Sequence, residues 1–264
     1  MLEGRICPAP RGLGREVGEM TDGGRAIWSQ SDTEVYRSLS RYAVPQRERQ
    51  IEIIVARVAK AMPDGDVLDL CCGEGFLTSA LLAQSPDSRV LAYDGSDDML
   101  AETQARAEHS ARLVTRRIDL AARDWRHGER PLRAVVSSLA VHHLDAAGKR
   151  ALFGDVLGML APGGVFVLAD VVQPATEAGS EISADLWDAE TRARSLELDG
   201  DLGGFEAFRR ADWNHFRHAV LDPVDKPSTV VEHLDWLREA GFAGVDLHWM
   251  SAGQMILSAG RPGS

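Results

Sequence analysis

The stretch Val67-Leu68-Asp69-Leu70-Cys71-Cys72-Gly73-Glu74-Gly75-Phe76-Leu77-Thr78 decides how this 264-residue chain is expected to fold. An apolar run ends in small residues, and a second apolar segment begins at Phe76. This order predicts a buried parallel strand, a tight turn and the N-terminus of a helix, with backbone amides that face a ligand. Gly73 and Gly75 lack a Cβ, so a ligand can lie directly against the main chain there.

An acid at the end of the second apolar run extends this pattern. The run Val90–Asp94 ends 25 positions after the acid of the first run. At the end of the second strand of a nucleotide-binding α/β fold, a carboxylate can accept hydrogen bonds from both ribose hydroxyls. The alternative is a solvated loop acid. Gly95 follows, and Ser96 or Asp97 is expected to cap a helix that runs through Met99.

Three more apolar runs continue the alternation of strands and helices. The third ends near Asp119, the fourth covers 134–138 and precedes His142 and His143, and the fifth ends at Asp170. Alternation over 66–172 predicts a parallel, doubly wound sheet that binds ligands at the carboxyl ends of its strands.

The motif at the first turn is similar to that of a known family. Its spelling, Asp-x-Cys-x-Gly-x-Gly, resembles motif I of the class I S-adenosylmethionine (SAM)-dependent methyltransferases. Cys71 replaces the first glycine, so a positive φ is costly there. The later runs resemble the small-molecule branch of the family. The resemblance covers roughly residues 40–172 well and 237–260 moderately.

The resemblance implies a Rossmann-like seven-stranded sheet, mostly parallel with an antiparallel last strand, with SAM as cofactor and S-adenosylhomocysteine as product. Asp119 would accept a hydrogen bond from the adenine amino group, and Leu120 would offer its backbone amide. Tyr42 and Arg47 could reach the methionine carboxylate, and the alternative for Arg47 is a solvated surface residue. The residues expected to bind the cofactor are Tyr42, Asp69, Cys71, Gly73, Gly75, Asp94, Gly95, Met99, Asp119, Leu120 and Ser138.

The candidate catalytic residues are His142, His143 and Asp170. Methyl transfer from a sulfonium by SN2 displacement needs in-line positioning and exclusion of water, and it requires neither a metal nor a covalent nucleophile. A histidine could serve as general base, because imidazole titrates near neutrality. The alternative is that the histidine pair is a packing feature and that Asp170 caps a loop or helix.

An aromatic and histidine-rich insertion follows the fifth run. We expect residues 176–221 to be helical and to form a lid. On a helix, Trp213, Phe216 and Arg217 would share one face. Trp213, His215, Arg217 and His218 are therefore the candidate acceptor-binding residues, and packing against the sheet domain is the alternative for the aromatic ones.

The expected organisation has five parts. Residues 1–30 form a flexible segment, and 31–64 form N-terminal helices for which Ser31 and Asp32 are candidate caps. Residues 65–175 form the SAM-binding core, 176–225 the helical insertion, and 226–264 a helix and β-hairpin that complete the core.

The composition limits the expected classes of substrate and the expected cellular compartment. The net charge of −11 gives no basic surface, which argues against a nucleic-acid substrate. Three cysteines do not suggest a disulfide framework, so we expect a cytoplasmic protein. Residues 1–21 lack the apolar core of a signal peptide, and no run is long enough for a membrane span. The oligomeric state is open, a homodimer being one option.

The sequence thus predicts a SAM-dependent methyltransferase that modifies an O, N, S or C atom of a small molecule. One alternative is a non-methylating SAM enzyme of the carboxy-SAM synthase type, although the strand-four signature of that family is absent. Another is a catalytically silent SAM-binding protein.

Overall fold

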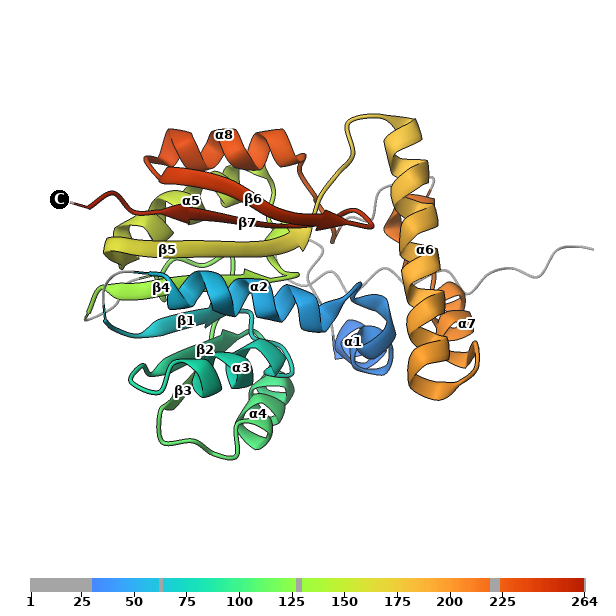
Figure 1. Ribbon diagram of the computed structural model, residues 1–264, viewed down its shortest axis with the longest axis horizontal. Coiled ribbons are helices and arrows are strands. Elements are labelled where there is room, and N and C mark those ends of the chain that lie inside the picture. Colours follow the sequence, from blue (N-terminus) through green and yellow to red (C-terminus); the bar gives the residue numbers. More distant parts are fainter. Residues whose placement is uncertain (1–29, 62–63, 127–129, 219–223, 264) are drawn as a thin grey trace, which may run out of the picture.

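The computed structural model describes residues 30–61, 64–126, 130–218 and 224–263. Its described strands form one sheet in the order β3-β2-β1-β4-β5-β7-β6 (Figure 1). They are β1 (Val67–Leu70), β2 (Val90–Asp94), β3 (Leu113–Arg117), β4 (Leu132–Ser138), β5 (Leu160–Val171), β6 (Ala243–Ser251) and β7 (Gln254–Gly260). Strand β7 runs antiparallel to both of its neighbours, while the other neighbouring strands are parallel. The predicted fold class is confirmed.

Two helical layers cover the faces of the sheet, because strand residues alternate between them. Leu68 and Leu70 of β1 face a core shared with α5 (Ala146–Met159) and α8 (Val230–Ala240). Val67 faces the opposite core, shared with α2 (Arg47–Ala59) and α3 (Phe76–Gln84). Helix α4 (Asp97–Arg106) packs against β2 and β3. Strand β1 is buried along its whole length, as its central position requires.

A third group of helices stands beyond the carboxyl ends of the parallel strands (Figure 1). It consists of α1 (Gln30–Ala43), α6 (Glu177–Asp199) and α7 (Gly203–Arg210). Trp187 of α6 lies at its centre, packs against Phe208 and donates an indole hydrogen bond to the carbonyl of Ala43 (2.7 Å). This contact fixes α6 against the end of α1.

Residues 213–218 do not form the expected α-helix. Helix α7 ends at Arg210, and His215–Arg217 form the short 3-10 helix η2. The Asn214 side chain donates to the carbonyl of Ala184 (3.0 Å) and to the carboxylate of Asp188 (2.8 Å). These bonds tie the chain to α6 and stop it from continuing as a helix.

The hairpin between β6 and β7 supports the same region. A Cβ on Gly253 would lie 2.2 Å from ring atoms of Phe216, so only glycine fits beneath that ring. The neighbouring β5 end is joined to this turn, because the amide of Val172 donates to the carbonyl of Gly253 (2.9 Å).

The N-terminal predictions have a mixed outcome. Helix α1 begins at Gln30, so Ser31 and Asp32 lie in its first turn and do not precede it. The segment predicted to be flexible lies outside the described residues apart from Gln30. In the part of the chain that the structure describes, no helix is both long and apolar enough to cross a membrane.

Candidate active site

The turn from β1 to α3 is held in a strained conformation. Cys71 has φ 60°, Gly73 has φ 54° and Gly75 has φ 79°, all in the left-handed region. The cysteine adopts this φ despite the steric cost that argued against it in the sequence. Leu139, at the end of the neighbouring strand β4, is also left-handed, with φ 56°. Strained non-glycine residues of this kind cluster at ligand sites.

The two glycines of the turn have different reasons to be glycine. A Cβ on Gly73 would meet nothing within 4 Å and would point into open space. A Cβ on Gly75 would lie 2.8 Å from both the Cα and the Oγ1 of Thr103 on α4. Gly73 therefore leaves room for a ligand, while Gly75 is needed for packing against α4.

Asp69, the acid of β1, stabilises the turn that follows the strand. Asp69 is buried, and its Oδ2 accepts a 2.6 Å hydrogen bond from the hydroxyl of Thr78 on α3. Burial raises the pKa of Asp69 to about 7, against the lowering effect of the Thr78 bond. Its carboxyl group joins the strand to the following helix, and its side chain also borders the cavity described next.

The acid of β2 holds the same turn from the other side. Asp94 accepts from the amides of Gly73 (2.9 Å) and Ser96 (2.9 Å), and burial raises its pKa. Ser96 is the N-cap of α4, because its hydroxyl accepts from the amide of Met99. Asp94 thus links the glycine turn to the start of α4.

A first cavity opens beside this turn. It holds about 540 Å³ of empty space, its open mouth included. Asp69, Cys71, Gly73 and Ser138 line it, as the predicted cofactor site requires, together with Arg47. The cavity lies at the carboxyl ends of β1 and β4, where ligands bind in this class of sheet.

The two residues proposed for the methionine carboxylate differ in placement. Arg47 lines the first cavity and donates to the carbonyl of Ser40, and its buried Nε has no hydrogen-bond partner among the described residues. Tyr42 lines neither cavity, because its hydroxyl donates to Asp199 of α6 (2.5 Å). The structure thus places Tyr42 in a contact that joins α1 to α6.

The residues expected around the adenosine lie outside both cavities. The Asp119 carboxylate accepts from the amide of Ala121 (2.8 Å), and Leu120 packs against the core. They remain close to the acid of β2, because the amide of Ile118 donates to the carbonyl of Asp94 (2.9 Å). Gly95 lies at the same edge, with its Cβ position 3.4 Å from the carbonyl of Ile118, while Met99 is buried in α4.

A second cavity adjoins the first. It holds about 610 Å³ of empty space with its open mouth, and Tyr36, Val44 and Leu139 line both cavities. Its other lining residues are mostly aromatic, histidine or acidic: Ala43, His142, His143, Val171, Trp187, Trp213, His215, His218, Asp225 and Gln254. No lysine or arginine of the described residues lines it.

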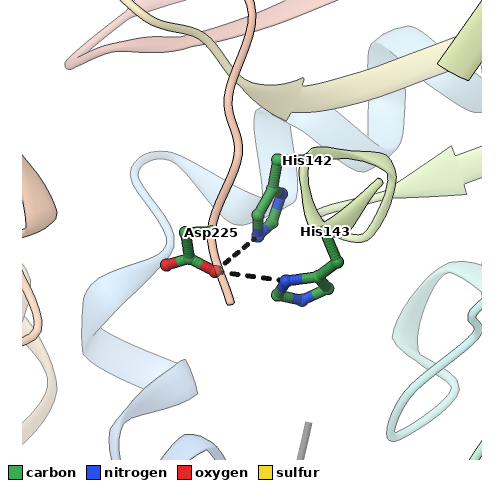
Figure 2. Close-up of side chains that lie close together, drawn as sticks. All are labelled: His142, His143 and Asp225. Atoms are coloured by element: carbon green, nitrogen blue, oxygen red, sulfur yellow. Dashed lines mark ion pairs between the residues drawn. The ribbon is translucent and has the colours of Figure 1, made fainter. Parts of the chain in front are cut away.

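Two histidines and a carboxylate meet on one wall of the second cavity (Figure 2). Both rings point toward the carboxylate of Asp225. His142 Nε2 lies 3.7 Å and His143 Nδ1 lies 3.1 Å from Asp225 Oδ1. On its other side, His142 Nδ1 lies 2.5 Å from Oδ1 of the fully buried Asp170. His142 is therefore held between two carboxylates.

The charges in this cluster are coupled. Burial opposes a charge on His142, yet Asp170 and Asp225 raise its pKa above the ordinary value. Burial and the neighbouring His142 lower the pKa of His143. Burial also opposes charge on Asp170 and Asp225, but the adjacent imidazoles lower the pKa of both carboxyl groups. The two carboxylates stay ionised, and His143 is the more readily neutral imidazole.

Asp225 was missed in the sequence because no motif surrounds it. A buried lysine places it: Lys149 of α5 donates to the carbonyl of Lys226 and to the hydroxyl of Ser228 (2.8 Å). The amide of Lys226 in turn donates to the carbonyl of His142 (2.7 Å). Burial lowers the pKa of Lys149 to about 8.

The predicted acceptor residues are only partly brought together. Trp213, His215 and His218 line the second cavity. Arg217 does not, because its guanidinium is bound to Asp185 (2.6 Å) and Asp188 (2.9 Å) of α6. The shared α-helical face predicted for Trp213 and Arg217 is thus wrong, since Trp213 precedes the short 3-10 helix and no α-helix joins the two residues.

Comparison with known sequences identifies relatives of the chain. The profile of a methyltransferase domain matches residues 67–164. An uncharacterized methyltransferase of Synechocystis sp. is 31% identical over 150 residues, which cover 56% of this chain and 67% of that protein. A carboxy-S-adenosyl-L-methionine synthase of Chromohalobacter salexigens is 30% identical over 68% of this chain and 62% of that protein. A trans-aconitate 2-methyltransferase of Yersinia pseudotuberculosis is 27% identical over 80% of this chain and 79% of its own length.

Solved structures share the fold. An O-methyltransferase family protein from Burkholderia thailandensis aligns with a TM-score of 0.59 at 17% identity, and this chain spans 56% of its length. DhpI, solved with S-adenosylhomocysteine, aligns with a TM-score of 0.52 at 20% identity, over 88% of this chain and 96% of DhpI. With the glycine turn, the strand order and these relatives in agreement, the chain belongs to the class I SAM-dependent methyltransferases, and SAM is its cofactor.

Proposed function

We propose that this chain transfers the methyl group of SAM to a small molecule, with the cofactor in the first cavity and the acceptor in the second. The observation that carries this proposal is the wall shared by the two cavities, formed by Tyr36, Val44 and Leu139. A donor on one side and an acceptor on the other would meet at this wall, as in-line displacement requires.

The cofactor residues follow from this placement. The amide-rich turn at Gly73 would lie against the methionine and ribose part of SAM, and Arg47 would pair with the methionine carboxylate. Asp94 would accept from the ribose hydroxyls while it keeps its bonds to the turn, since a carboxylate can accept more than two hydrogen bonds. Asp119 and Leu120 are the candidates for the adenine edge.

The reaction forms a bond between the acceptor atom and the methyl carbon and breaks the bond from that carbon to sulfur. The bonding pair stays on sulfur, which gives neutral S-adenosylhomocysteine. When the acceptor is a hydroxyl, its proton leaves to the histidine cluster, where His143 is the candidate base and Asp225 stabilises the imidazolium that forms. Asp170 fixes the orientation of His142.

The acceptor is expected to be a planar molecule without bulky anionic groups. Tyr36, Trp187 and Trp213 offer aromatic surface, and the histidines offer hydrogen bonds. We assign the segment from α6 to η2 the role of a lid over this cavity, because α6 and α7 stand beyond the strand ends (Figure 1) and the segment carries Trp187 and Trp213.

Two measurements test the proposal. Calorimetry should show SAM binding, and a screen of small-molecule acceptors should show release of S-adenosylhomocysteine. SAM binding without turnover of any acceptor would favour a silent SAM-binding protein. Mass analysis of the small molecule that co-purifies with the chain would reveal carboxy-SAM if the chain belonged to that type.

A further inference from the structure

The cluster of His142, His143 and Asp225 has the geometry of a metal-binding site. One ligand atom from each residue lies within 4.8 Å of the other two. The carboxylate approaches both rings through the same oxygen, Oδ1, at 3.7 Å from His142 and 3.1 Å from His143. Figure 2 shows the three side chains converging from two different segments.

The two distances from Asp225 to the histidines fit ligands of one ion. A separation of 3.7 Å between His142 Nε2 and Asp225 Oδ1 is too long for a hydrogen bond. Metal–ligand bonds of about 2.1 Å place neighbouring ligand atoms about 3.0 Å apart in octahedral and about 3.4 Å apart in tetrahedral coordination. Shifts of a few tenths of an ångström would bring both measured distances to these values.

Asp170, the hydrogen-bond partner of His142, orients the His142 ring as a metal ligand. His142 Nδ1 lies 2.5 Å from Asp170 Oδ1, so Nδ1 carries the proton toward that carboxylate. The lone pair of the neutral ring is then on Nε2, which faces Asp225. Histidines that bind metal ions commonly donate their other ring N–H to a carboxylate, which fixes the tautomer and strengthens the ligand.

The surroundings favour a positive ion. Asp170 and Asp225 bring two carboxylates to the cluster. The two nearby lysines do not line the second cavity, because Lys149 is bonded to the carbonyl of Lys226 and to Ser228, and the Lys226 ammonium faces backbone carbonyls. The cavity side of the cluster leaves coordination positions for an acceptor or water, as in metal sites that act on a substrate.

We propose that His142, His143 and Asp225 bind a divalent transition-metal ion of the zinc type, with Asp170 as the positioning residue for His142. Two imidazoles and one carboxylate suit zinc, cobalt and iron better than magnesium or calcium. This inference goes beyond the proposed function, because methyl transfer stands or falls independently of it. With an ion bound, His143 would be a ligand and not the base, and the ion would lower the pKa of a coordinated acceptor hydroxyl so that its proton could leave to water.

The test is metal titration of the full chain, purified without an affinity tag and stripped with a chelator. Zn²⁺ binding is followed by calorimetry and Co²⁺ binding by visible absorption. We expect one ion per chain and Co²⁺ bands typical of nitrogen and oxygen ligands. A thiolate charge-transfer band would instead assign the ion to the cysteines and overturn the proposal.

Variants locate the site. Asp225→Asn and His143→Ala should weaken Zn²⁺ binding at least ~10-fold, and Asp170→Asn should weaken it by ~10–100-fold through the lost orientation of His142. His109→Ala, which removes an exposed histidine after α4, is the matched control and should bind as the parent chain does. Circular dichroism confirms that each variant is folded.

Two results would overturn the proposal. One is a parent chain that binds no ion in stoichiometric amount. The other is binding that survives both Asp225→Asn and His143→Ala. SAM affinity is measured on the same samples, so loss of metal binding with SAM binding intact leaves the proposed function standing.

Discussion

The two cavities are built in different ways, although they share a wall. The glycine turn that lines the first is held by contacts between residues close in sequence: the amide of Gly73 and the carboxylate of Asp94 are 21 residues apart. The second is assembled from distant segments, and the carbonyl of His143 meets Lys226 across 83 residues. Its aromatic wall comes from α1, α6 and the segment that leads into η2. Local backbone geometry shapes the turn that characterises the first cavity, and tertiary packing forms the second.

This difference separates the part that would bind the cofactor, which does not depend on the acceptor, from the part that would recognise the acceptor. A turn made of backbone amides and small residues can hold the same cofactor whatever acceptor is used. Side chains carried by an insertion can change without disturbing that turn. We therefore expect changes in the second cavity to affect turnover, and changes in the first to affect SAM binding.

The largest expected effect lies in the histidine cluster. His143→Gln should lower kcat by roughly 10²–10⁴-fold, because the acceptor loses its proton acceptor or its ion. The dissociation constant for SAM should stay within a few-fold, since His143 does not line the first cavity. S-adenosylhomocysteine release and SAM calorimetry provide the two readouts. His248→Gln on β6 is the control. A loss of SAM affinity as large as the loss of kcat would contradict the assignment of SAM and the acceptor to different cavities.

A second prediction concerns pH and the first cavity. Burial raises the pKa of Asp69 to about 7, so between about pH 4 and 7 the native state keeps a proton that the unfolded chain has released. This carboxyl group therefore makes the fold less stable as pH rises through that window. Asp69→Asn should remove this contribution, which is roughly 2–4 kcal/mol across the window.

The measurement for Asp69 is urea unfolding of parent and variant at several pH values between about 4 and 7. The stability difference between them should grow in favour of the variant as pH rises. Asp97→Asn, at an exposed acid paired with Arg117, controls for the loss of one charge. A constant difference across the window would contradict the prediction.

The two glycines of the turn give a matched pair. Both have positive φ, so the backbone cost of about 1 kcal/mol for alanine is common to both. Gly75→Ala should cost roughly 1–3 kcal/mol more in unfolding free energy, because its methyl group meets Thr103. Gly73→Ala should instead weaken SAM binding at least ~10-fold, a loss of about 1.4 kcal/mol. Thermal unfolding and calorimetry separate the two. If Gly73→Ala were the less stable protein and kept its SAM affinity, Gly73 would be a structural glycine.

The smallest effects are expected at two predicted site residues whose side chains contact α6 and line neither cavity. Tyr42→Phe and Arg217→Gln should change SAM affinity and acceptor KM less than about 2-fold, because both side chains pair with acids of α6. Each should cost no more than about 1 kcal/mol of stability. A ten-fold fall in SAM affinity for Tyr42→Phe would show that the tyrosine hydroxyl contributes to cofactor binding.

The sequence predicted the parts of the molecule that depend on local order. The strand–turn–helix at Val67–Thr78 and the acid of β2 could be recognised because periodicity and glycine spacing report directly on the backbone there. The left-handed φ of Cys71 could not, since the surrounding strands and Asp94 hold a turn that the cysteine alone would avoid. The fold class followed from the order of these elements.

The second cavity was harder to predict for physical reasons. Asp225 lies in a segment without a motif. The buried Lys149, the bond from the Lys226 amide to the His142 carbonyl and the β-bridge between Val172 and Ser228 bring it to the histidines. Tyr36 and Trp187 line the same cavity, although they lie on α1 and α6, far apart in the chain. Trp213 and Arg217 share no helical face, because α7 ends at Arg210 and Asn214 binds α6.

The contact between Gly253 and Phe216 has a consequence for engineering. The hairpin that completes the sheet also supports the Phe216 ring of η2, so the segment that we propose as the lid and the last two strands should be exchanged together. Consider a chimera that receives residues 176–225 from a relative with a larger residue at the position of Gly253. Its insertion would be shaped to pack on that larger side chain and would not fit the glycine of this hairpin. Transplants that move the hairpin turn together with the insertion should yield soluble hybrids more often than transplants of the insertion alone.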